Sequence, residues 1–130
     1  MKFSFVIAMS GVLVLVQALP AQEPQPEKQK QFIYVLRLVP RLYDDKNWTK
    51  EDNAALDRHF ARFQRAIVTR ELILAGRTHE PGDKTFGIAI FEAKDEVAAR
   101  RFMENDPAVV AGLMTAELHP FSVALQRKNL

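Results

Sequence analysis

Residues 32–39 read FIYVLRLV, and this stretch decides the fold because it is apolar on two faces. A continuous run of β-branched and aromatic residues predicts a buried β-strand, which Pro40 ends. In a strand, alternate side chains point to opposite faces. One face carries Phe32, Tyr34, Leu36 and Leu38, and the other carries Ile33, Val35, Arg37 and Val39.

Helix patterns occupy two later parts of the chain. Thr49 begins TKED, in which Thr49 caps a helix and Asp52 completes a weak capping box. Spacings of four, three and four then place Leu56, Phe60, Phe63 and Ile67 on one apolar face. Asp95 caps a second predicted helix, which runs to about residue 105. Its inward-facing residues are expected to be Val97, Phe102 and Met103.

Three more strands are predicted, at residues 71–76, 85–91 and 117–125, and a turn at 81–83 joins the first two into a hairpin. The last strand contains Pro120, which cannot donate to a ladder, so we expect this strand at a sheet edge or with a bulge. The order is β-α-β-β-α-β with right-handed crossovers. It predicts an α+β, ferredoxin-like sandwich over residues 32–127, with two helices on one face of a four-stranded antiparallel sheet.

The second face of this sheet is apolar too. Leu72 and Leu74 oppose Ile73 and Ala75 in the second strand, and Phe86, Ile88 and Ile90 oppose Ala89 and Phe91 in the third. Two helices cover only one face, and an open apolar face of this size exceeds what soluble monomers usually show. We therefore expect a homodimer in which two copies pack sheet on sheet.

The first 21 residues have the layout of a secretory signal peptide. Lys2 is their only charged residue, an apolar run follows, and small residues stand at two cleavage points, Ala18 and Ala21. The run is too short and too interrupted for a membrane anchor. Residues 22–31 contain two prolines and no large apolar residue, which predicts a disordered tether. We expect a secreted or periplasmic protein with no stable membrane anchor after cleavage.

Composition excludes several functional classes. The 18 basic and 16 acidic residues alternate along the chain, so no basic stripe for nucleic acid is present. There is no cysteine, so a domain of this size depends on its core rather than on disulfides. The sequence also lacks a Gly-rich phosphate loop and a GxSxG motif.

His59 and Asp106 are the candidate catalytic residues. His59 precedes Phe60 at the border of the first helix's apolar face, and Asp106 precedes Pro107 where the second helix is expected to end. Each has an ordinary explanation, as a boundary histidine and as a turn residue. As a pair, the carboxylate would fix the imidazole tautomer and leave the other ring nitrogen to move a proton.

Weaker candidates lie elsewhere in the chain. His59 with His119 or His79 and Asp106 offers metal-ligand chemistry, but no HxxxH or HxH spacing supports it, so we expect no metal and no cofactor. Arg37 is the one strong charge in an apolar strand. It contacts a ligand or pairs with an acid at a sheet edge, and the pattern does not separate these alternatives.

Five short blocks together resemble the YciI-like (YCII-related) family. They are His59-Phe60-Ala61-Arg62-Phe63, Leu72-Ile73-Leu74-Ala75-Gly76, Asn105-Asp106-Pro107, Ala111-Gly112-Leu113 and His119-Pro120-Phe121. The order and spacing of the blocks carry the resemblance, which covers the chain from about residue 32 to residue 125. It implies a dimeric α+β barrel and a His–Asp pair in a cleft, with His59 and Asp106 at those positions. Members often have proline after Ala-Gly, whereas this chain has Arg77, which changes the charge of the cleft.

Two functions remain open from these patterns. The first is a small lyase-, isomerase- or dehalogenase-like enzyme, in which His59 is the general acid or base and Asp106 orients it. Its substrate would be a small organic molecule in an aromatic cleft of Phe60, Phe86, Phe91 and Phe121. Candidate ligand-binding residues are Arg37, Arg77 and His119. The second is a non-catalytic exported dimer that binds a small ligand or a protein partner.

Overall fold

The computed structural model describes residues 27–127. The predicted signal peptide, residues 1–21, and residues 22–26 of the predicted tether lie outside the described residues. The strands are β1 (Lys30–Leu38), β2 (Leu72–Arg77), β3 (Gly87–Ala93) and β4 (Met114–Pro120). The α-helices are α1 (Lys50–Val68), α2 (Glu96–Glu104) and α3 (Pro107–Val110). No helix within this range is long and apolar enough to cross a membrane.

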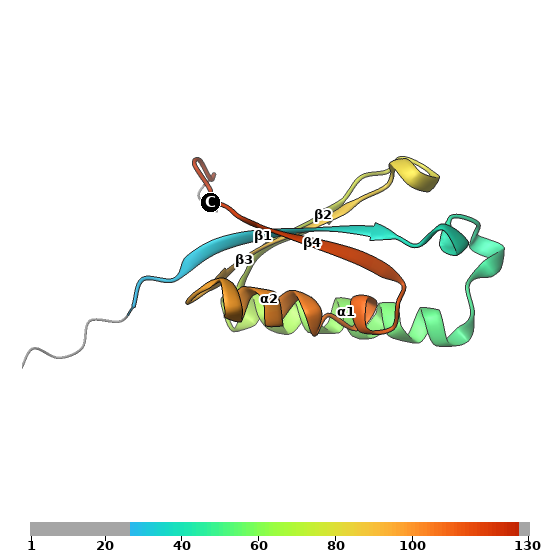
Figure 1. Cartoon of the computed structure of the whole chain (residues 1–130), viewed down its shortest axis with the longest axis horizontal. Helices are drawn as coiled ribbons and strands as arrows, with labels where there is room; N and C mark the ends of the chain where they lie inside the picture. Colours follow the sequence, from blue (N-terminus) through green and yellow to red (C-terminus); the bar gives the residue numbers. More distant parts are fainter. Residues whose placement is uncertain (1–26, 128–130) are drawn as a thin grey trace, which may run out of the picture.

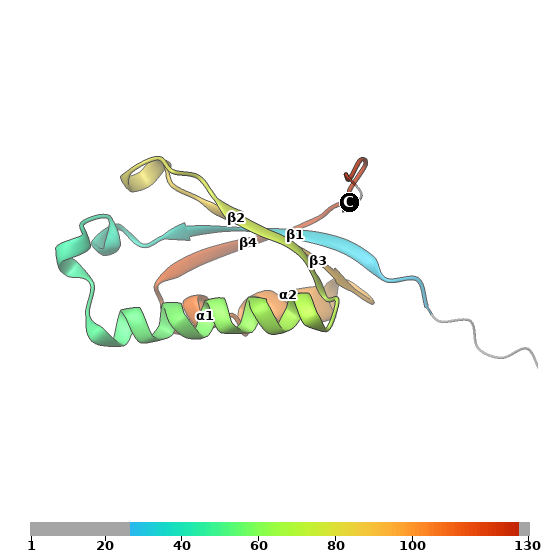
Figure 2. The same cartoon turned by 180° about the vertical axis from the view of Figure 1, so that it is seen from behind.

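The strands form one antiparallel sheet in the order β2-β3-β1-β4. Both long helices lie against the same face of this sheet, and no α-helix of the described residues lies on the other face (Figure 1). Seen from behind, α1 runs along the sheet in front of α2 (Figure 2). The predicted ferredoxin-like α+β fold is confirmed.

Two strand boundaries differ from the prediction. β1 begins at Lys30, so the last two residues of the predicted tether pair with β3, Lys30 with Ala93 and Gln31 with Glu92. β4 spans Met114–Pro120 rather than residues 117–125. Its early start follows from Gly112, whose φ of 72° reverses the chain directly after α3. β4 lies at a sheet edge, as Pro120 predicts.

β2 contains a β-bulge, which changes which residues face the helices. Leu72 pairs with Phe91 and Leu74 with Ile90, with a register shift between the two leucines. Paired residues share a face, so Leu72 lies under the helices with Phe91, whereas Leu74 joins Ile90 on the opposite face. The prediction that Leu72 and Leu74 share a face is therefore wrong, because the extra residue of the bulge reverses the alternation.

The two long helices begin as predicted but bury different side chains. The capping box at Thr49 is complete, and Asp95 caps α2 by accepting from the backbone N–H of Ala98. The buried face of α1 carries Asp52, Ala55, His59, Phe63 and Ala66. Phe60 and Ile67, predicted to face the core, are half exposed, and Val97 on α2 is exposed. Ala55 and Ala66 are buried on this face of α1, whereas the larger Phe60 and Ile67 lie beside it.

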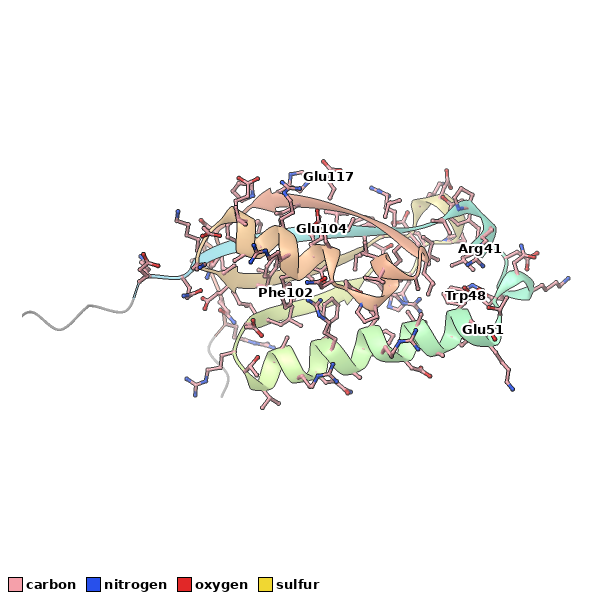
Figure 3. All side chains as sticks on the ribbon, turned by 60° about the horizontal axis from the view of Figure 1, so that its bottom comes forward. Arg41, Trp48, Glu51, Phe102, Glu104 and Glu117 are labelled. Carbon is pink, nitrogen blue, oxygen red and sulfur yellow. The ribbon has the colours of Figure 1, made fainter. Side chains whose placement is uncertain are left out.

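The core lies between the helices and the sheet. Buried residues of β1 and β3, among them Phe32, Tyr34, Leu36 and Phe91, pack against Phe63 of α1 and Met103 of α2. A smaller cluster under the start of α1 contains Leu42, Ala55, Ala108 and Leu113. Arg41 and Trp48 both lie near this end of α1 (Figure 3). The Arg41 guanidinium donates two hydrogen bonds to the Asp52 carboxylate, at 2.8 and 2.7 Å, and so joins the loop before α1 to the helix.

Replacement of Thr49 by alanine tests how much the capping box contributes. The Thr49 hydroxyl accepts from the backbone N–H of Asp52 at 3.1 Å, and alanine removes this acceptor. We expect Thr49→Ala to lower the free energy of unfolding by about 1 kcal/mol, measured by urea denaturation. Thr49→Ser keeps a hydroxyl and is expected to retain most of the stability. Equal stability of the wild type and Thr49→Ala would contradict the prediction.

Candidate active site

His59 and Asp106 are in direct contact. His59 is on the buried face of α1, and Asp106 directly precedes α3, forty-seven positions later in the chain. The Nδ1 of His59 lies 2.6 Å from Oδ1 of Asp106. The His59 ring packs at 4.4 Å from the Phe63 ring and at 5.3 Å from the Phe60 ring, centroid to centroid, which holds its orientation. The predicted pairing of the two side chains is present in the structure.

The sequence predicts that Asp106 ends the second helix. In the structure, Asp106 begins the next helix instead. α2 stops at Glu104, and Asp106 is the N-cap of α3, with Pro107 in the first turn. Its Oδ1 accepts from the backbone N–H of Ala108 at 2.9 Å. An aspartate before proline suits both boundaries, because the residue before proline avoids the helical region and N-caps have extended backbones. The hydrogen bond from the Ala108 N–H also holds the Asp106 carboxylate in place beside His59 on α1.

Tyr34 is a third member of the site, although the alternation of β1 predicts only that it faces the core. Its hydroxyl donates to Oδ2 of Asp106 at 2.7 Å, and both side chains are fully buried. The signal that could have found it is the single hydroxyl among the four side chains of the inward face of β1. A buried tyrosine hydroxyl usually requires a hydrogen-bond partner.

The hydrogen bonds around Asp106 decide the protonation of the three side chains in the site. Burial raises the pKa of the Asp106 carboxyl, but the hydrogen bonds from His59, Tyr34 and the Ala108 N–H, with the charge of His59, outweigh it and hold the pKa below its ordinary value. Burial and then the neighbouring carboxylate raise the pKa of Tyr34. Asp106 is therefore an ionised acceptor and Tyr34 a donor at neutral pH. It follows that His59 Nδ1 carries a proton and that Nε2 is the nitrogen left for a ligand.

Arg62, one turn after His59, connects α1 to α2. Its guanidinium donates to the backbone carbonyl of Phe102 at 2.6 Å and lies over the Phe102 ring, 4.1 Å from the centroid. Phe102 in turn stacks on Phe91 in the sheet, with 4.5 Å between centroids. The positive charge of Arg62 opposes part of the rise in the pKa of Tyr34. Arg62 therefore joins α1, which carries His59, to α2, the helix that precedes Asp106 in the chain.

A cleft of about 630 Å³ opens beside His59, between α1 and the sheet. From α1 it is lined by Leu56, His59, Phe60, Phe63, Gln64 and Ile67. The helical spacing grouped four apolar residues on one face of α1, and all four line the cleft: Leu56, Phe60, Phe63 and Ile67. Of the four aromatic residues predicted to line it, Phe60 does so and three do not. Phe91 is in the core, Phe86 lies against Arg37, and Phe121 lines a separate open hollow near the start of β1.

The predicted ligand-binding residues fall on different sides of the sheet. Arg77 lines the cleft. Arg37 and His119 are on the face away from the helices, where Arg37 lies 5.3 Å from the centre of the Phe86 ring and His119 Nε2 lies 3.3 Å from Glu117 Oε1. Neither shares a site with His59. Among residues 27–127, no three His, Cys, Asp or Glu side chains come together in a way that could hold a metal ion.

Comparison with protein families gives one match to this arrangement. The model of the YCII-related domain matches residues 36–122, which run from the end of β1 to just past β4 and include both His59 and Asp106. The chain belongs to the YCII-related family. No curated protein matches this YCII-related chain.

Solved structures with a similar fold include two enzymes. One is the 5-chloro-2-hydroxyhydroquinone dehydrochlorinase (TftG) from Burkholderia phenoliruptrix AC1100, in complex with 2,5-dihydroxybenzoquinone. It is 20% identical, covers 71% of this chain and 93% of its own, and gives a TM-score of 0.49. The other is SnoaB, a cofactor-independent oxygenase from Streptomyces nogalater, with 19% identity, 75% and 95% coverage, and a TM-score of 0.40. Neither likeness bears on what this YCII-related protein binds.

Replacement of Tyr34 by phenylalanine tests the third member of the site. It removes one hydrogen bond to an ionised carboxylate and leaves the ring in place, so we expect a loss of about 1.5–3 kcal/mol of unfolding free energy at pH 7. Because the folded-state pKa of Asp106 is lowered, this contribution is complete above the unfolded pKa of about 3.9 and shrinks as the pH falls further. Urea denaturation at pH 7 and pH 3 measures both effects. Tyr43→Phe, at a more exposed tyrosine, is the matched control, and an equal loss in both variants would refute the prediction.

Proposed function

We propose that this protein is a small enzyme in which His59 and Asp106 act as a general acid–base pair on a small organic molecule bound in the cleft. The observation that carries the proposal is the 2.6 Å contact between His59 Nδ1 and Asp106 Oδ1, in a histidine that also lines the cleft. A carboxylate on Nδ1 supports an imidazolium and orients Nε2 toward the substrate. The family and the fold are consistent with this reading.

The reaction class that suits this pair is lyase- or isomerase-like. His59 Nε2 takes a proton from a C–H or O–H bond of the substrate, and the resulting imidazolium is stabilised by the Asp106 carboxylate. In an elimination, the electron pair of the broken C–H bond forms a double bond, and the leaving group departs with its own bonding pair. In an isomerisation, the imidazolium returns the proton to another atom. Both steps balance without a further reactant.

The surroundings of the pair favour such chemistry. The walls of the cleft are mainly aliphatic and aromatic, and burial of the dyad in low-dielectric surroundings strengthens each charge interaction. Asp106 itself is fully buried behind His59, so a ligand in the cleft meets the imidazole rather than the carboxylate. Positioned proton transfer of this kind contributes about 10²–10⁴ in rate.

We also propose that two copies pack through the helix-free face of the sheet. This face carries Ile33, Val35, Leu74, Ile88 and Ile90, in adjacent strands. Leu74 is 47% exposed, and the bulge adds it to this face. An apolar surface across three neighbouring strands is what a sheet-on-sheet interface buries. Export through the sequence of residues 1–21 remains part of the proposal and would place the dimer outside the cytoplasm.

Nitrogen NMR of ¹⁵N-histidine-labelled protein tests the catalytic pair without a known substrate. We expect neutral His59 to carry its proton on Nδ1, whereas exposed histidines favour Nε2. The His59 signal is assigned by its loss in His59→Gln. Asp106→Asn should release this tautomer preference, as judged by the same spectrum. A neutral wild-type His59 with its proton on Nε2 would rule out the proposed base.

Activity then separates an enzyme from a binding protein. For any compound that the protein turns over, His59→Gln and Asp106→Asn are expected to reduce kcat/KM by about 10²–10⁴. His79→Gln, at an exposed loop histidine that does not line the cleft, is the control and should keep full activity. A ligand that protects the wild type from unfolding, is never converted and binds both variants equally would support the non-catalytic alternative.

Assembly is tested by a charge on the helix-free face. Ile90 pairs with Ile33 and Leu74 at the centre of this face and does not line the cleft. We expect the wild type to sediment as a dimer and Ile90→Lys as a monomer, because a buried unpaired charge opposes the interface. Val97→Lys, at an exposed valine on α2, should remain dimeric. A monomeric wild type at micromolar concentrations would exclude this interface.

A further inference from the structure

The bulge in β2 turns Arg77 into the cleft. Simple alternation from Leu72 would place Arg77 on the helix-free face, because the two residues are five positions apart. The register shift after Leu72 reverses this. Arg77 pairs with Gly87, and Gly87 pairs with Leu36, whose side chain is buried on the helix side. Bulges commonly redirect a side chain beside a functional site.

The sheet keeps space free in front of Arg77. A Cβ added at Gly87 would lie 3.4 Å from the Gly76 carbonyl oxygen and 3.6 Å from Leu36 Cβ, which are close to ordinary contacts. The backbone of Gly87 is not left-handed, so its conformation does not require glycine. What the glycine provides is the absence of a side chain on the cleft floor. Ala75, the neighbouring inward residue of β2, is also small.

Among residues 27–127, Arg77 is the one permanently charged side chain in the lining of the cleft. No acidic side chain of this range lines it, and Asp106 lies out of reach behind His59. Within residues 27–127, Arg77 makes no side-chain hydrogen bond or ion pair, and its side chain is exposed. A guanidinium beside apolar walls and without a protein counter-charge attracts an anion. Its planar fork of donors matches the two oxygens of a carboxylate.

We propose that the cleft selects small organic carboxylates, with Arg77 holding the carboxylate and the apolar body lying against Phe60, Phe63 and Trp48. The inference rests on the proposed function, because it assigns the ligand class of the same cleft. His59 Nε2 then meets the part of the molecule remote from the charge. The site binds its ligand through one ion pair and one apolar surface.

Trp48 provides the measurement. It is the single tryptophan of the chain and it lines the cleft, so its fluorescence reports occupancy directly. Three probes share one phenyl body and differ in charge: phenylpropanoate, phenylpropanamide and phenylpropylamine. All titrations are run at one pH, and the Arg77 variants decide whether a preference for the anion comes from arginine. We expect phenylpropanoate to bind at least about tenfold more tightly than the amide, and the amine most weakly.

Variants assign this preference to Arg77. Arg77→Gln should bind phenylpropanoate and phenylpropanamide equally, whereas Arg77→Lys should keep part of the preference. Arg101→Gln, which removes an exposed charge on α2 away from the cleft, should behave as the wild type. Gly87→Val should weaken the binding of all three probes, because the valine side chain occupies the floor of the cleft. Circular dichroism checks that each variant is folded.

Several results would overturn the proposal. They are equal binding of phenylpropanoate and phenylpropanamide to the wild type, a preference that survives in Arg77→Gln, and no binding of any probe at millimolar concentration. If Arg77→Gln does not fold, the binding of the three probes to the wild type tests the proposal by itself. None of these results depends on the tautomer of His59, so failure of the carboxylate assignment is distinguishable from failure of the acid–base pair.

Discussion

The Asp106 carboxylate is the point on which the site depends. It accepts from His59 on α1, from Tyr34 on β1 and from the backbone N–H of Ala108 on α3, all while fully buried. A buried charge is costly unless it is paired and hydrogen-bonded, and here three donors from three elements meet that requirement. The same contacts that make the charge tolerable also fix the imidazole. Structure and reactivity therefore share one set of hydrogen bonds.

The two faces of the sheet form two different surfaces. The face toward the helices carries the core at one end and the cleft at the other, where Gly87 and Ala75 leave room above the strands. The face away from the helices carries aliphatic side chains together with Arg37 and His119. The bulge in β2 acts on both surfaces, because it moves Leu74 to the open face and Arg77 to the cleft.

Much of the fold could be predicted from local patterns. The apolar run of β1, the capping box at Thr49 and the cap at Asp95 are decided by neighbours in the chain, and the structure has each of them. The faces of the elements were harder. Helical spacing grouped Phe60 and Ile67 with the core, but both line the cleft. An apolar row on a helix looks the same whether it meets a core or a cavity, and only the packing of α1 against the sheet distinguishes them.

The sequence by itself determined the order of strands and helices and the two apolar faces of β1, because periodicity, caps and turns depend on adjacent residues. The pair His59 and Asp106 was implied by the resemblance of short blocks to the YCII-related family. Only the tertiary structure decided that Tyr34 completes the pair and that Arg77, rather than Arg37 or His119, lines the cleft. The first depends on a contact across seventy-two positions and the second on a one-residue bulge. Both arise from how separate elements pack. The one local sign of the first is the single hydroxyl on the inward face of β1, and the second has no local sign.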